Sequence, residues 1–186
     1  MTSQIFRFSE CKVNLKHIVF VALFMMATVS INAQQTAPMR ALIGQSLSKM
    51  QQSDPQSVVN AIAELNRIDA MFPDSIQPKY QIALQSLVYA VSFPKAESTN
   101  NLMAEAEQTI NKLGDMKQMD QSDLFTLRGF LDMARIVQNP AQNGQRYYLS
   151  VMENFDKALK INPNNALAQQ LQQKFQEGMK QAMRTP

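Results

Sequence analysis

Apolar residues recur at steps of three and four along most of the chain, which is the spacing of one helix face. The stretch 55–72 shows the pattern well, because Ser53 and Asp54 provide a cap before Pro55 at the first helical position, and Pro73 stops the run. The same reading predicts helices over residues 38–51, 55–72, 77–92, 98–113, 122–137, 146–161 and 165–182. Sustained period-two alternation is missing, so the sequence predicts an all-α fold.

A longer period of 45 residues runs through the same positions. Three segments share the spacing apolar, three residues, apolar, two residues, apolar: Ala61, Leu65 and Ile68; Ala106, Ile110 and Leu113; Val151, Phe155 and Ala158. Pro73 and Pro163 follow two of these segments at equivalent places. The period predicts about three antiparallel helix hairpins stacked side by side, with extra residues between paired helices at 93–99 and 138–145, where Pro140 and Gly144 indicate a break.

The segment "FDKALKINPNNALA" resembles the second helix and following turn of a tetratricopeptide repeat (TPR). Val151, Phe155, Ala158 and Pro163 occupy the small, aromatic, alanine and proline places of that motif, and Ala61, Leu65, Ile68 and Pro73 fit the same frame. The middle segment departs from it, with Gln118 where proline belongs. Residues 127–171 are similar to the C-terminal part of small exported helical-repeat proteins of unassigned function. The resemblance implies a short TPR-like α-solenoid that binds protein or peptide segments.

The first 33 residues have the order of a secretory signal peptide. Arg7, Lys12 and Lys16 precede an apolar run at 18–31, and the small residue Ala33 follows. The run is shorter than the roughly 20 apolar residues that a membrane span needs. We therefore expect a leader at 1–33 and a TPR-like domain at 34–186, exported and periplasmic or extracellular, and soluble after cleavage near Ala33.

Removing the leader removes the chain's only Cys and only His, Cys11 and His17. Serine-type triads usually need His as the base, and zinc sites usually need His or Cys, so the sequence predicts no metal site and no cofactor. The leader also holds three of the 18 Lys and Arg residues and one of the 15 Asp and Glu residues, so the positive and negative charges of the remaining chain are nearly equal in number. A nearly balanced domain gives no basis for nucleic-acid binding.

Carboxylate pairs remain as candidate chemistry, because glycoside cleavage can use two acids alone. The local pairs are Glu105 with Glu107 and Asp120 with Asp123. Since Asp120 precedes a predicted helix, capping is the favoured interpretation for it.

Surface candidates lie on the fifth and sixth predicted helices. Arg128, Asp132 and Arg135 share one face, where two cations could hold a carboxylate of a partner, and Arg146 and Tyr147 lie near a predicted loop edge. The alternative for the first three is a solvated ladder of ion pairs. The function we expect is non-enzymatic binding of a protein or peptide, with no nucleic acid and no membrane once the leader is cleaved. A carboxylate-based enzyme acting on glycans and a membrane-tethered structural subunit stay open as alternatives.

Overall fold

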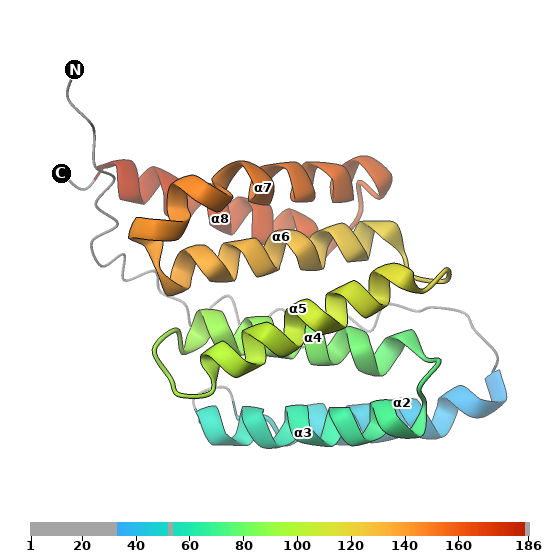
Figure 1. Ribbon diagram of the computed structural model, residues 1–186. Coiled ribbons are helices and arrows are strands. Elements are labelled where there is room, and N and C mark those ends of the chain that lie inside the picture. Colours follow the sequence, from blue (N-terminus) through green and yellow to red (C-terminus); the bar gives the residue numbers. More distant parts are fainter. Residues whose placement is uncertain (1–32, 52–53, 185–186) are drawn as a thin grey trace. The chain divides into compact units, whose positions relative to one another are not determined.

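The computed structural model describes residues 33–51 and 54–184, and all of the regular structure in this part of the chain is helical (Figure 1). The helices are α2 (Ala33–Ser48), α3 (Pro55–Met71), α4 (Ile76–Ser92), α5 (Thr99–Asp115), α6 (Gln121–Gln138), α7 (Pro140–Ile161) and α8 (Ala166–Arg184). The predicted all-α class is confirmed for these residues. The predicted leader, apart from Ala33, lies outside them. Within the described ranges, each helix is too short or too polar to cross a membrane.

The sequence pattern places most helix ends correctly, since α3, α4, α5, α6 and α8 agree with the predicted ranges to within two residues. Capping explains the start of α3, where the Asp54 carboxylate accepts hydrogen bonds from the backbone N–H groups of Gln56 (3.0 Å) and Ser57 (3.2 Å). Helix α2 begins earlier than predicted, at Ala33, and contains Pro38.

The predicted break at 138–145 is wrong. Asn139 alone separates α6 from α7: its side chain accepts a hydrogen bond from the N–H of Gln142, and Pro140 takes the first helical position. Proline fits there because the first N–H of a helix has no partner within the helix. Gly144 lies buried inside α7 rather than in a loop.

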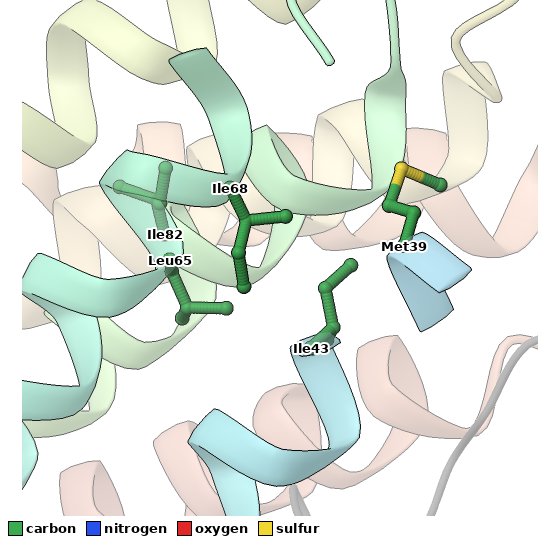
Figure 2. Close-up of a cluster of buried hydrophobic side chains, with 5 residues drawn as sticks. All are labelled: Met39, Ile43, Leu65, Ile68 and Ile82. Carbon is green, nitrogen blue, oxygen red and sulfur yellow. The ribbon is translucent and has the colours of Figure 1, made fainter. Parts of the chain in front are cut away.

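The described residues fall into two compact units, 33–119 and 120–184. In the first unit, α3 packs against α2 and α4, and α4 packs against α5. Figure 2 shows one of its hydrophobic clusters, in which Met39 and Ile43 of α2 meet Leu65 and Ile68 of α3 and Ile82 of α4. Helix α4 is the most enclosed, because all ten residues from 82 to 91 are buried.

A buried lysine fixes the turn between α3 and α4. The Lys79 ammonium donates to the Asp69 carboxylate at 2.7 Å and also to the backbone carbonyl oxygen of Pro73. Lys79 is only 8% exposed, so these acceptors replace the water that its charge would otherwise bind. The end of α3 is therefore tied to the first turn of α4.

The second unit contains a tight hairpin of α6 and α7, and α8 packs against both of these helices. Helix α6 can approach α7 closely at Gly129, where an added Cβ would lie 2.9 Å from Cε1 of the fully buried Phe155 ring. The missing side chain of Gly129 makes room for that ring.

All nine apolar residues of the three 45-residue segments are buried, at 5% exposure or less. They are Ala61, Leu65, Ile68, Ala106, Ile110, Leu113, Val151, Phe155 and Ala158. Pro73 and Pro163 are exposed in the turns that follow α3 and α7. The apolar residues of the 45-residue pattern are therefore part of the hydrophobic core.

We expect Gly129→Ala to destabilise the chain, because the new methyl group meets a buried ring that has little room to move. Overpacking costs about 1–3 kcal/mol, against a gain of up to about 1 kcal/mol in helix propensity. Gly178→Ala is the matched control, since nothing lies within 4 Å of an added Cβ there. Urea unfolding of both variants should show Gly129→Ala as the less stable, and equal stability would contradict the close approach.

Candidate functional site

Five candidate residues from the sequence lie on the α6–α7 hairpin, and the structure gathers four of them into one cluster. Asp132 and Arg135 come from α6, and Arg146 and Tyr147 come from α7. Arg128 lies apart from this cluster, over the ring of Phe125. We call the strip formed by these residues with Phe125, Ser150, Glu153 and Lys157 the α6–α7 seam (the helices are labelled in Figure 1).

Two arginines share the Tyr147 ring at one end of the seam. The guanidinium carbons of Arg135 and Arg146 lie 5.2 and 5.1 Å from the ring centroid. Both distances are within the range of attraction between a cation and an aromatic face. Arg146 is exposed and Tyr147 is half-buried, so this end of the seam combines charge and aromatic surface that solvent can reach.

Asp132 is the buried centre of the seam. Its carboxylate accepts hydrogen bonds from Nη1 of Arg135 at 2.8 Å and from the Ser150 hydroxyl at 2.6 Å. Only 7% of Asp132 is exposed, whereas the sequence left open a solvated ladder of ion pairs. Arg135 is therefore held in place by a buried acid.

A second aromatic residue lies at the other end. Arg128 and Lys157 lie 5.7 and 5.8 Å from the centroid of the Phe125 ring. Lys157 also pairs with Glu153 at 3.5 Å, and the two side chains are 54% and 67% exposed. Such an exposed pair contributes little to stability, so Lys157 can exchange its partner at low cost.

Hairpin register explains why these residues meet. Three contacting pairs, Arg135 with Tyr147, Asp132 with Ser150, and Phe125 with Lys157, are each equidistant from residue 141. Sequence reasoning missed Phe125, Ser150 and Lys157 because it began α7 at residue 146. The sequence does contain a signal for the earlier start of α7: Asn139 and Pro140 are a cap followed by proline, as Asp54 and Pro55 are at the start of α3.

The candidate acids have structural partners. Asp120 caps α6, as predicted, by accepting a hydrogen bond from the Asp123 N–H at 2.9 Å. Asp123 accepts one from the Asn165 amide at 3.0 Å. Burial raises the pKa of the Asp123 carboxyl and the neighbouring Asp120 charge adds to this effect, while the Asn165 hydrogen bond lowers the same pKa.

Asn165 connects α8 directly to α6, and through Ser122 to α7. Its amide also donates to the hydroxyl groups of Ser122 (2.9 Å) and Thr126 (3.3 Å), and its carbonyl oxygen accepts from the Ala168 N–H as the cap of α8. Ser122 in turn donates to the backbone oxygen of Ala158 on α7.

In the first unit, Glu105 of α5 accepts a hydrogen bond from Asn66 of α3 at 2.6 Å, and Glu107 is exposed. A small cavity of about 10 Å³ is lined by Met50, Val58, Gln85, Val88, Tyr89, Ser92 and Phe93. This volume is about that of a single water molecule, far below the roughly 300 Å³ at which typical small-molecule sites begin. The described residues contain no cluster of three or more His, Cys, Asp or Glu side chains that could hold a metal ion.

Comparison of the chain with protein-family models, curated proteins and solved structures gives no match. The site is therefore described by its own chemistry: a partly exposed strip of cations and aromatic rings around the buried acid Asp132.

The raised pKa of Asp123 predicts a pH-dependent stability. A carboxyl whose pKa is higher in the folded state contributes fully below its unfolded value of about 4, and the contribution is lost as pH rises through the folded pKa. Asp123→Asn keeps an oxygen that can accept from Asn165 but does not titrate. We expect the melting temperature of this variant, relative to the parent chain, to be higher at pH 7 than at pH 3.

Thermal melts at the two pH values check the expectation. In an Asp120→Asn background the pH-dependent difference should shrink, because one of its causes is gone. A difference that is the same at both pH values would contradict the assignment.

Removing the charge of Asp132 should destabilise the second unit far more than removing an exposed acid of the same seam. Asp132→Asn weakens the hydrogen bonds from Arg135 and Ser150, and hydrogen bonds to charged groups contribute about 1.5–3 kcal/mol. Glu153→Gln is the matched control, with an expected cost below about 0.5 kcal/mol. Urea unfolding at pH 7 compares them, and a small cost for both would mean that Asp132 is not the centre of the seam.

Proposed function

We propose that this chain is a non-enzymatic helical-repeat module that binds a protein or peptide in the cell envelope or periplasm. In this proposal α2–α3, α4–α5 and α6–α7 are three TPR-like hairpins of a short α-solenoid, and α8 follows the last. The starts of α4, α6 and α8 support it, because Ile76, Gln121 and Ala166 lie 45 residues apart, which is the period of the sequence pattern. The proposal requires no metal and no cofactor.

The observation that carries the binding role is the chemistry of the α6–α7 seam. Phe155 and its buried equivalents form the core, while Arg146, Tyr147 and Arg128 of the same hairpin remain within reach of solvent. Arg and Tyr are enriched among residues that dominate protein interfaces, since they combine area with directed hydrogen bonds. The hairpin thus separates a packing face from a face suited to a partner.

The proposed location rests on the N-terminal sequence pattern alone. Cations, a short apolar run and Ala33 have the order of a secretory signal peptide. An exported module that lacks Cys and His after residue 33 would rely on its packed helices for stability.

A crosslinked pull-down from native cells tests the function. Arg128→Ala with Arg146→Ala removes two seam cations but leaves the Asp132 ion pair intact, so we expect an unchanged melting temperature and loss of the captured partner. Lys117→Ala with Lys180→Ala is the matched control, because both lysines are exposed outside the seam. A partner retained by the arginine variant, or none captured by the parent chain, would contradict the proposal.

A further inference from the structure

We propose that the cavity beside the end of α4 binds one water molecule, which forms hydrogen bonds with the Ser92 hydroxyl and with further polar groups of the cavity wall. The inference is independent of the proposed function, because the cavity lies in the first unit and the α6–α7 seam lies in the second. It rests on three observations: a buried hydroxyl without a partner, a cavity with the volume of one water molecule, and polar side chains among the residues that line it.

The Ser92 hydroxyl lacks a hydrogen bond within the part of the chain that the structure describes. Its oxygen is shielded from solvent, although Ser92 as a whole is only partly buried. A hydroxyl can donate one hydrogen bond and accept two. A buried polar group that makes none of these bonds costs free energy relative to its hydrated state. An occupant that can both donate and accept therefore stabilises the folded chain at this position.

The volume of the cavity selects water as that occupant. Ser92 lines the cavity together with six other residues, and the space is about 10 Å³. A buried water molecule needs at least about 10–15 Å³ of such space, whereas sites for small organic molecules begin at about 300 Å³. The cavity therefore suits one water molecule and leaves no room for a larger solute.

Four of the lining residues share one face of α4. Gln85, Val88, Tyr89 and Ser92 follow the spacing i, i+3, i+4 and i+7, which brings side chains to the same side of a helix. Tyr89 also belongs to a hydrophobic cluster with Val58 of α3, which lines the cavity from the facing helix. The cavity thus lies where the polar side chains of this α4 face meet the hydrophobic core.

Gln85 and Tyr89 supply polar groups for the remaining hydrogen bonds of the water. Gln85 is 4% exposed, and its Nε2 donates to Oε1 of Gln81 at 3.2 Å. A glutamine amide has two N–H donors and a carbonyl oxygen, so this bond uses only one of its donors. The hydroxyl of Tyr89, a residue that is 2% exposed, can both donate and accept. A buried water molecule makes about three hydrogen bonds, and the cavity wall contains enough groups for them.

Rotation of the Ser92 side chain is the competing way to satisfy its hydroxyl. A serine in a helix can donate to the backbone carbonyl oxygen four residues earlier, which here belongs to Val88. That hydrogen bond requires no water. The two arrangements differ in the position of the hydroxyl and in the occupant of the cavity, so experiment can distinguish them.

Ser86 provides a matched control on the same helix. Its hydroxyl is also buried without a hydrogen bond among the described residues, but Ser86 does not line the cavity. We expect Ser92→Ala to lower the melting temperature of the full-length chain by about 2–4 °C, because the hydrogen bonds through the water are lost. Ser86→Ala should leave the melting temperature unchanged or raise it, because the change removes a buried hydroxyl that has no partner.

The same substitution on the same helix makes the difference between the variants a measure of the two environments. Equal melting temperatures, or a larger loss for Ser86→Ala, would overturn the proposal.

A high-resolution crystal structure of the full-length chain locates the water directly. We expect electron density for a single water oxygen in the cavity, at about 2.8 Å from Oγ of Ser92. A Ser92 hydroxyl that donates to the Val88 carbonyl oxygen, with no density in the cavity, would overturn the proposal. Density for a molecule with several non-hydrogen atoms would also overturn it, because the occupant would then not be water.

Discussion

The close approach of α6 and α7 at Gly129 is the constraint on which the second unit depends. A residue without a side chain at this position allows the Phe155 ring to rest against the backbone of α6. That contact, together with the single connecting residue Asn139, sets the register of the hairpin. Once the register is set, Asp132 meets Ser150 and Arg135 meets Tyr147 with no further adjustment. The chemistry of the seam is thus a consequence of packing.

Polar groups hold the turns of both units in different ways. In the first unit the cation of Lys79 bridges Asp69 and the backbone between α3 and α4. In the second unit the neutral amide of Asn165 links α6 and caps α8, and Ser122 links α6 to α7. Buried polar groups of this kind cost free energy unless every donor and acceptor finds a partner, so they favour one arrangement of the helices over others.

Most of the fold could be predicted from the sequence because helix faces and caps are local features. The spacing around Leu65, Ile110 and Phe155 identified core residues, and all three are buried. The start of α7 is not predicted correctly, because Pro140 and Gly144 indicate a break, whereas Asn139 and Pro140 in fact form a cap followed by the first helical residue. Because the position of the turn decides which residues face each other across a hairpin, this error also prevented the prediction of the contacts that Ser150 and Lys157 make with α6.

The candidate site was less predictable than the fold for the same reason. Helical spacing placed Arg128, Asp132 and Arg135 on one face, but it could not show that Asp132 would be buried and bonded to α7. Burial of a charged side chain depends on a partner from another helix, and the sequence pattern of one helix does not reveal that partner. The roles of Lys79 and Asn165 could not be predicted for the same reason, because Lys79 binds Asp69 of α3 and Asn165 binds residues of α6.

The single-residue connection at Asn139 also bears on how the chain folds. Contacts between α6 and α7 join residues that are near one another in sequence, so closing this hairpin costs less chain entropy than closing a longer loop would. Proteins dominated by such local contacts fold quickly. We therefore expect the hairpin to be the folding nucleus of the second unit, formed before α8 docks, so that the strip of cations and rings between its helices forms with the first tertiary contacts.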